Sequence, residues 1–317
     1  MTRAFFIVGP TATGKSEIAA DVAREVGAEI VGADAFQIYR GLDLLTAKPE
    51  AATLAKAAHH LVGIIPTAEE MNVEKYRRAA MHAIGEINSR GKLAIVVGGS
   101  GLYIKALTHG LAPLPETDPK LREKLNAVSL DDLRAQLVEL DPEAAKKIDI
   151  KNRRRLVRAL EICLSTGKPA TQVVARRDDR GVPRSTPATT GAESLARGTG
   201  TFVLRDREEL YGRINQRVEM MFECGVIEEV RAAGTTSATA SQMIGLREIR
   251  DLLAGKNSLP QCIAEIQQAT RRYAKRQLTW FRRQTNFFPL NLSFLTHDEA
   301  VKWISLRILS EAGTRND

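Results

Sequence analysis

The sequence predicts an α/β fold, in which helices flank a parallel sheet and an all-helical domain is inserted between two parts of that core. Short apolar runs alternate with helical patterns over the first 110 residues. After about residue 112 no strand pattern occurs until "TFVLR" at 201–205, and helical patterns follow it. We therefore expect a core of residues 1–111 and 201–317, with a helical domain over 112–200.

The first strand and the first helix enclose a glycine-rich loop. The apolar run "AFFIV" is followed by "GPTATGKS", which has the spacing G-x-x-x-x-G-K-[ST], and then by a helical pattern with Ile18, Val22 and Val26. In this setting the loop binds phosphates with backbone N–H groups, a lysine charge and a hydroxyl that can hold Mg²⁺. Its members are Gly9, Pro10, Thr11, Ala12, Thr13, Gly14, Lys15 and Ser16. The motif does not say which molecule carries the phosphates.

Two further strands end at the same edge of the expected sheet. "AEIVGAD" is expected to end at Asp34, beside the loop. That carboxylate could hold Mg²⁺ through water or act as a general base, and an ordinary turn aspartate is the alternative. "KLAIVVGG" ends in glycines rather than in the acid that ATPases usually have there, which counts against ATP hydrolysis. Gly98, Gly99 and Gly101 would permit close backbone approach, and Ser100 could bond a base edge or a phosphate.

The inserted domain is predicted from four helical patterns. "DPKLREKL", "SLDDLRAQLVEL" and "DPEAAKKI" begin with Asp or Ser at the N-cap, and "RRRLVRALEICLSTG" ends at Gly167. Residues 176–200 are rich in Gly, Pro, Ser, Thr and Arg, so we expect a mobile loop there. The core then resumes with "REELYGRINQRVEMMFECG", "QMIGLREIRDLLAG" and a long helix from about Pro260 to Arg283.

The composition indicates a cytoplasmic protein with a polyanionic partner. The net charge is +8, which suits a nucleic acid. No apolar run is long enough to cross a bilayer, and the N-terminus lacks a signal-peptide pattern. Neither a disulfide framework nor a zinc site is expected from Cys163, Cys224 and Cys262, which lie far apart. The paired His59 and His60 lack further ligands, so we interpret them as structural or hydrogen-bonding residues.

Basic residues are concentrated in three places. Arg213 and Arg217 share one helical face and could clamp a diphosphate, although spacing alone favours a surface ion pair of Arg213 with Glu209. "KNRRRLVR" and "RRYAKRQLTWFRR" form basic ridges, and in the second Tyr273 and Trp280 line a neighbouring face. Such surfaces suit phosphates and unpaired bases, and a solvated helix with buried aromatics is the alternative. Two such stretches in a basic chain favour RNA.

Together these segments resemble the tRNA dimethylallyltransferases, also called tRNA isopentenyltransferases, of the short bacterial type. The similarity runs from "GPTATGKS" through "DAFQIYRGLDLLTAKP", "HHLVGIIP", "VGGSGLYIKAL" and "RRLVRALEI" to "AKRQLTWFRR". It implies a P-loop-type α/β core and a helical insertion that closes over the tRNA anticodon stem-loop. The implied reaction transfers a dimethylallyl group from dimethylallyl diphosphate to N6 of the adenosine immediately 3′ of the anticodon.

The resemblance also implies roles for individual residues. Asp34 would be the general base, and Lys15, Arg213 and Arg217 would bind the diphosphate with Mg²⁺ near Ser16. The target adenosine would have to leave its stack to be reached. The implied tRNA contacts are Asp34, Ala35, Phe36, Gln37, Ser100, Arg122, Arg154, Arg155, Leu156, Val157, Arg158, Gln242, Met243, Ile244, Gly245, Leu246, Arg247, Lys275, Arg276, Gln277, Trp280 and Arg282.

The sequence departs from the family pattern at Ala35, Leu45, Gly63 and Leu246, where Ser, Gly, Asp and Tyr are usual. None of these positions belongs to the loop or is Asp34, but Ala35 and Leu246 fall in the implied RNA-contact segments and so bear on RNA choice or efficiency more than on the reaction. The remaining alternatives are a small-molecule kinase that binds ATP in the loop, a nucleotide-gated RNA-binding protein without covalent chemistry, and a prenyltransferase acting on free AMP. A monomer is expected.

Overall fold

The computed structural model describes residues 3–111, 114–115, 118–175, 195 and 199–313. The chain divides into two compact units, one of residues 1–110 and 193–317 and the other of residues 111–192. Most of the loop expected at 176–200 lies outside the described residues. The C-terminal boundary expected for this loop, residue 200, is wrong. Leu195 is buried and its N–H bonds to the carbonyl of Leu107, and a strand already begins at Thr199.

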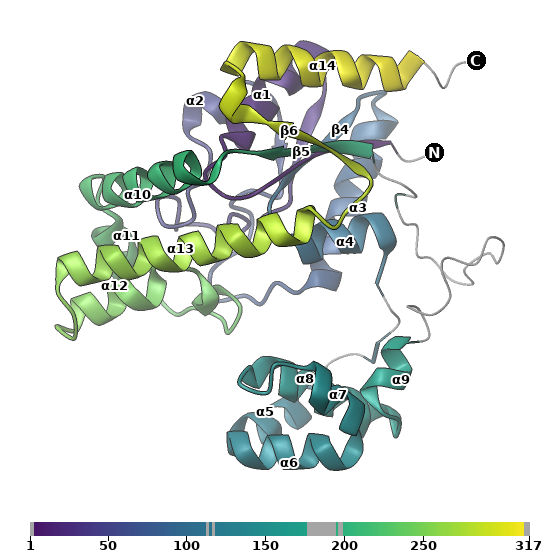
Figure 1. Ribbon diagram of the computed structural model, residues 1–317, viewed down its shortest axis with the longest axis vertical. Helices are drawn as coiled ribbons and strands as arrows, with labels where there is room; N and C mark the ends of the chain where they lie inside the picture. The colour runs from purple at the N-terminus through teal and green to yellow at the C-terminus, as the bar shows by residue number, and fades with distance from the viewer. Residues whose placement is uncertain (1–2, 112–113, 116–117, 176–194, 196–198, 314–317) are drawn as a thin grey trace. The chain divides into compact units, whose positions relative to one another are not determined.

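A six-stranded sheet forms the centre of the first unit (Figure 1). Its strand order is β3-β2-β4-β1-β5-β6, and every neighbouring pair is parallel. This confirms the predicted parallel α/β core. The strands are β1 (Ala4–Val8), β2 (Glu29–Gly32), β3 (His59–His60), β4 (Ala94–Gly98), β5 (Thr199–Leu204) and β6 (Phe287–Asn291). β1 lies between β4 and β5, so the loop after β1 is placed at the middle of the carboxyl edge of the sheet.

Alternate side chains of β1 point to opposite faces of the sheet. Because these side chains are apolar, both faces are covered by helices. Phe5 and Ile7 belong to the core on the face of α1 (Lys15–Val26) and α14 (His297–Gly313). Phe6 and Val8 belong to the core on the other face, with residues of α3 (Val73–Ser89) and α4 (Gly101–His109). The short helix α2 (Ala51–Leu54) precedes β3.

The part of the chain between β5 and β6 is helical and includes the longest helix. α10 (Arg207–Glu223) packs against α13 (Leu259–Phe281), and α11 (Val226–Ala232), the 3-10 turn Ala240–Gln242 and α12 (Leu246–Leu253) lie between them in sequence (Figure 1). A capping box of Ser258 and Gln261 begins α13. A second 3-10 turn, Leu292–Phe294, leads from β6 to α14.

The second unit is a small all-helical body with its own core. Its helices are α5 (Pro119–Ala127), α6 (Leu130–Leu140), α7 (Pro142–Lys147), α8 (Arg153–Thr166) and α9 (Ala170–Ala175). The predicted N-caps are confirmed, since the side chains of Asp118, Ser129 and Asp141 accept hydrogen bonds from backbone N–H groups of the following turn. α5, α6 and α8 contribute the buried leucines of the core.

None of the described helices combines the length and apolar character needed to cross a membrane. Cys163 and Cys262 are buried free thiols, and Cys224 is an exposed one. His59 and His60 are structural as interpreted, because Nδ1 of His59 bonds to the carbonyl of Ala57 and Nε2 of His60 bonds to Glu29.

Candidate active site at the carboxyl edge of the sheet

The glycine-rich loop after β1 is closed by tight contacts that only small residues allow. A Cβ at Gly9 would lie 2.2 Å from the carbonyl oxygen of Val203. Ala12 and Gly14 both have positive φ, which turns the chain back toward α1. None of the described residues accepts a hydrogen bond from the N–H groups of Ala12, Thr13 or Gly14. The N–H groups of Ala12 and Gly14, which are partly exposed, are therefore available to an anion at the N-terminus of α1, whereas Thr13 is fully buried.

Lys15 is the partly buried cation of the loop. Its Nζ donates to the carbonyl oxygen of Pro10 at 3.2 Å. Burial lowers the pKa of Lys15 to about 8, the negative charge of Asp34 opposes this, and the positive charge of Arg217 adds to it. An anion bound in the loop would favour the charged form of this lysine.

Asp34 lies two residues beyond β2 and uses only one carboxylate oxygen for the local turn. Oδ1 accepts hydrogen bonds from the N–H groups of Phe36 at 2.9 Å and Gln37 at 3.3 Å. Oδ2 has no hydrogen-bond partner among the described residues. The turn role considered from the sequence is thus real, and it leaves a second oxygen for chemistry.

The turn after β4 is locked to the Asp34 segment. A Cβ at Gly98 would lie 2.1 Å from the carbonyl oxygen of Ala33, and one at Gly101 would lie 2.7 Å from the ring of Trp280. Oγ of Ser100 accepts a hydrogen bond from the N–H of Ala35 at 2.9 Å. The predicted close approach at these glycines is confirmed, and Ser100 holds the backbone beside Asp34.

Arg217 of α10 reaches the loop from the buried side of its helix. Its Nη1 donates to Oγ1 of Thr11 at 2.9 Å, and its buried Nε has no partner among the described residues. Burial lowers the pKa of Arg217, and the charge of Asp34 opposes this shift. The charges of Arg217, Lys15 and Asp34 therefore act on one another. The buried Nε of Arg217 is an unpaired donor among them.

Arg213 has different neighbours. Its Nε donates to the carbonyl oxygen of Ala12 at 2.9 Å. Glu209 does not pair with it, because that carboxylate binds Arg205 at 2.5 Å. The ion pair of Glu209 with Arg213 that spacing favoured is therefore wrong. Burial and the charge of Arg205 lower the pKa of Arg213, with Glu209 and Glu17 opposing.

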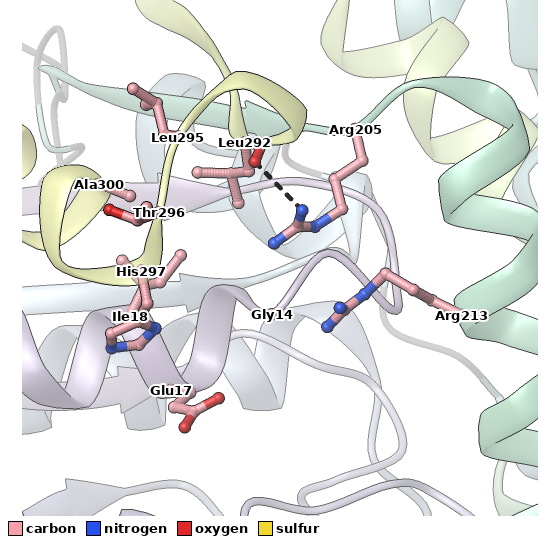
Figure 2. Close-up of a pocket in the computed structure, with 10 residues that line it drawn as sticks. All are labelled: Gly14, Glu17, Ile18, Arg205, Arg213, Leu292, Leu295, Thr296, His297 and Ala300. Carbon is pink, nitrogen blue, oxygen red and sulfur yellow. Dashed lines mark hydrogen bonds between the residues drawn. The ribbon is translucent and has the colours of Figure 1, made fainter.

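Arg205 and Arg213 both line a pocket of about 280 Å³ beside the first turn of α1. Figure 2 shows the two guanidinium groups extending toward Gly14, with Glu17 below and His297 across the pocket. Leu292, Leu295 and Ala300 supply an apolar part of the lining. Arg205 was missed from the sequence, although its position as the last residue of the predicted strand "TFVLR" is the signal that could have found it.

The basic helix α13 has an exposed and a buried side. Lys275, Arg276 and Arg282 are exposed, as a surface for RNA requires. Gln277 is only 5% exposed and faces the loop instead, so its side chain does not belong to that surface. Trp280 is partly buried against Gly101.

The implied contacts between 242 and 247 divide in the same way. Gln242 and Arg247 are exposed, whereas Met243, Gly245 and Leu246 are buried. Gly245 has a φ of 95°, and a Cβ there would lie 2.8 Å from Cδ1 of Leu45. Two of the departures from the family pattern, Leu45 and Leu246, thus belong to the core. Phe36 and Gln37 are partly buried, and the Gln37 amide donates to the carbonyl of Ala47 at 2.7 Å.

In the second unit the implied contacts also differ in exposure. Arg154 and Arg155 are exposed on α8, whereas Leu156 and Val157 lie in the core of this unit. Arg122 and Arg158 both bind Glu161, which is 2% exposed. Glu161 was missed, and its i, i+3 spacing from Arg158 was the only signal for it.

Two buried tyrosines near Asp34 were also missed. The rings of Tyr76 and Tyr103 stack with centroids 3.8 Å apart, and the hydroxyl of Tyr76 donates to the carbonyl of Gly32 at 3.1 Å. Burial raises the pKa of both phenols, and the charge of Asp34 adds to the shift. Tyr103 belongs to the quoted "VGGSGLYIKAL" segment, but its direction could not be read from the sequence.

Three comparisons with known proteins agree. A family model described as IPP transferase matches residues 37–284. The chain is 43% identical over 286 residues to tRNA dimethylallyltransferase 1 of Citrifermentans bemidjiense, covering 89% of this chain and 90% of that protein. It is 40% identical over 308 residues to tRNA dimethylallyltransferase of Akkermansia muciniphila, covering 97% and 99%. The crystal structure of the full-length tRNA isopentenylpyrophosphate transferase from Bacillus halodurans matches with a TM-score of 0.71 at 31% identity, covering 100% and 98%.

Proposed function

The chain belongs to the IPP transferase family, and from that premise we propose that it transfers the dimethylallyl group of dimethylallyl diphosphate to N6 of the adenosine immediately 3′ of the anticodon in tRNA. The products are N6-dimethylallyladenosine in the tRNA and free diphosphate. The observation that carries the proposal is the position of Asp34, whose unused Oδ2 shares an electrostatic environment with Lys15 and Arg217. A base and a diphosphate site are thus adjacent.

The loop supports the departure of diphosphate. As the C–O bond to the dimethylallyl group breaks, its electron pair goes to a diphosphate oxygen and negative charge grows there. The free N–H groups of Ala12 and Gly14, the charge of Lys15 and Nη2 of Arg217, which bonds no described residue, are donors already in place. Preorganised donors of this kind stabilise a developing anion without reorganisation. Arg213 supports the loop through the carbonyl of Ala12.

Asp34 supports the attack by N6. The N6 lone pair is delocalised into the adenine ring, so N6 is a poor nucleophile unless a base removes its proton as the new N–C bond forms. Oδ2 of Asp34 has no other partner among the described residues and can accept that proton. The hydrogen bonds to Oδ1 hold the carboxylate in one orientation.

Mg²⁺ is the proposed cofactor, and the residues present fit it. Among the described residues no group of three or more His, Cys, Asp or Glu side chains could hold a metal ion. Mg²⁺ needs no such group, because it is commonly held by one or two protein oxygens, substrate phosphates and water. The Ser16 hydroxyl forms no hydrogen bond to a described residue and Asp34 has a free oxygen. The bound ion would neutralise charge on the diphosphate.

The RNA would bind to two separate basic surfaces. In the first unit these residues are Lys275, Arg276 and Arg282, which are exposed on or directly after α13. In the second they are Arg154 and Arg155 on α8. We propose that the helical unit of residues 111–192 closes over the anticodon stem-loop, and that the target adenosine leaves its stack to reach Asp34. A monomer in the cytoplasm remains the expectation.

One experiment tests the reaction. The protein is incubated with Mg²⁺, labelled dimethylallyl diphosphate and unmodified tRNA, and the nucleosides are analysed after digestion. Prenylated adenosine in the tRNA is expected, and free AMP in place of tRNA should give none. Transfer of phosphate from ATP without prenylated adenosine would refute the proposal in favour of the kinase alternative, which none of the named relatives supports.

A further inference from the structure

Gln277 is a buried polar residue in the middle of α13 that bridges two loops of the active site. Its Oε1 accepts a hydrogen bond from the N–H of Thr11 at 2.9 Å. Its Nε2 donates to the carbonyl oxygen of Gly99 at 2.9 Å. Gln277 therefore joins the glycine-rich loop after β1 to the turn after β4, and both halves of its amide are used.

The space for this amide exists only because residue 99 is glycine. A Cβ at Gly99 would lie 2.1 Å from Nε2 of Gln277. One helical turn earlier, Tyr273 interacts with both Ser100 and Gln277. Ser100 in turn holds the N–H of Ala35, next to Asp34. One side of α13 thus contacts the supports of the phosphate loop and of the proposed base.

Thr11 is held from two helices at once. Gln277 of α13 binds its N–H, and Arg217 of α10 binds its side-chain oxygen. Because its N–H is already bonded to Gln277, Thr11 does not offer this group to a phosphate. Its position instead fixes where Arg217 lies, and Arg217 carries the unpaired Nε of the site.

The opposite side of the same helix carries the exposed basic residues. Lys275 and Arg276 directly precede Gln277 in sequence and point to solvent. α13 is a continuous helix of 23 residues and moves as one rigid body. A displacement of its basic side therefore also displaces Gln277. No other contact of α13 with the loop is needed for that transmission.

We propose that Gln277 is a positioning residue which holds Thr11, and through it Arg217, and which couples tRNA binding on α13 to diphosphate binding in the loop. This assignment rests on the proposed function for the identity of the RNA. It replaces the expectation that Gln277 contacts tRNA. Because Gln277 is 5% exposed and both halves of its amide are bonded within the protein, its loss should weaken diphosphate binding and its coupling to tRNA while leaving tRNA affinity unchanged.

The test measures the Kd of inorganic diphosphate by calorimetry, with and without unmodified tRNA, so that no chemistry intervenes. In the wild type tRNA should tighten diphosphate binding. In Gln277→Leu the Kd of diphosphate should rise about tenfold, because the hydrogen bond that positions Thr11 is lost. The ratio of the Kd values without and with tRNA should fall toward one. Gln284→Leu is the matched control, since the side chain of Gln284, three residues beyond α13, bonds only the carbonyl of Trp280. It should behave like the wild type.

Gln277→Glu separates positioning from a general loss of packing. A protonated glutamic acid has the same shape, accepts from Thr11 and donates to Gly99, whereas the ionised form loses that donor and repels diphosphate. Diphosphate affinity in this variant should therefore recover toward the wild-type value as the pH falls through the titration of the new carboxyl group. Gln277→Leu should show no such recovery relative to the wild type.

Three results would overturn the assignment. A loss of tRNA affinity at an unchanged diphosphate Kd would make Gln277 an RNA contact. An absence of any tRNA effect on diphosphate binding in the wild type would remove the coupling. Identical pH profiles for the Glu and Leu variants would make the role purely structural. If the wild type binds diphosphate but makes no prenylated adenosine, the proposed function fails while these binding measurements still decide the role of Gln277.

Discussion

Nη1 of Arg217 donates a hydrogen bond to Oγ1 of Thr11 at 2.9 Å while Nε of the same guanidinium is buried without a partner among the described residues. One planar group thus holds the loop through Nη1, and its Nη2, which bonds no described residue, stays available to the diphosphate. A lysine cannot do both, because it presents a single point charge. We expect Arg217→Lys to lower kcat/KM for dimethylallyl diphosphate about 100-fold in steady-state assays with saturating tRNA.

Arg213→Lys is the comparison for that variant, since it lies four residues away on the same helix. Arg213 binds the carbonyl of Ala12 and lines the pocket with Arg205, away from the charges of Asp34 and Lys15. Its kcat/KM should fall less than that of Arg217→Lys. Equal losses in the two variants would show that both arginines bind the diphosphate in the same way.

Asp34→Asn tests the base without disturbing the turn. The new amide keeps an oxygen to accept the N–H groups of Phe36 and Gln37, but it can no longer take a proton from N6. We expect kcat to fall about 10²- to 10⁴-fold, with the Kd for tRNA within a factor of two, measured by single-turnover kinetics and filter binding. Retention of kcat would contradict the assignment of Asp34 as the base.

Four of the six strands could be predicted from the sequence because strands buried on both faces read as short apolar runs. The other two lie at the edges of the sheet and carry no such signal. β3 is only His59–His60, and its second residue is held by Glu29 of β2. β6 contains Pro289, which a central strand would not tolerate and an edge strand does.

A site residue could be predicted only where it lies close in sequence to the end of a predicted strand. Lys15 is in the loop motif after β1 and Asp34 lies two residues after β2, and the ends of these strands meet at one edge of the sheet. Glu209 could not be assigned in this way, because Arg205 and Arg213 are both four residues from it and spacing supports either pair equally. The choice depends on how α10 is rotated against the loop, which is a property of tertiary packing.

Lys15 should take up protons when the anion binds above neutral pH. Its pKa is lowered to about 8, so part of the population is neutral at higher pH, and bound diphosphate favours the charged form. Calorimetry of dimethylallyl diphosphate binding at pH 8.5, in buffers of different ionisation enthalpy, should show net proton uptake. Uptake should vanish in Lys15→Arg, whose guanidinium stays charged. In Asp34→Asn it should begin at lower pH, because the charge that opposes the shift is gone.

Glu29 should make the fold sensitive to acid. Although burial opposes the shift, hydrogen bonds from His60, Lys92 and Arg90 lower the pKa of Glu29 from 4.5 to about 2. A depressed folded-state pKa contributes stability that is complete above about 4.5 and is lost as the pH falls toward 2. Between these values the Tm of the wild type should fall more steeply than that of Glu29→Gln. Parallel curves of Tm against pH would show that the network contributes no net stability.

The salt dependence of tRNA binding should identify the basic side of α13 as a phosphate surface. Lys275 is exposed there, and Lys302 is exposed on α14, which packs on the opposite face of the sheet. Each phosphate contact releases a condensed counterion, so Lys275→Ala should reduce the slope of log K against log salt by about 1. Lys302→Ala, which removes the same charge, should leave the slope unchanged because net charge alone does not set it. Equal changes in both variants would mean that tRNA responds to the overall charge of the protein and not to α13.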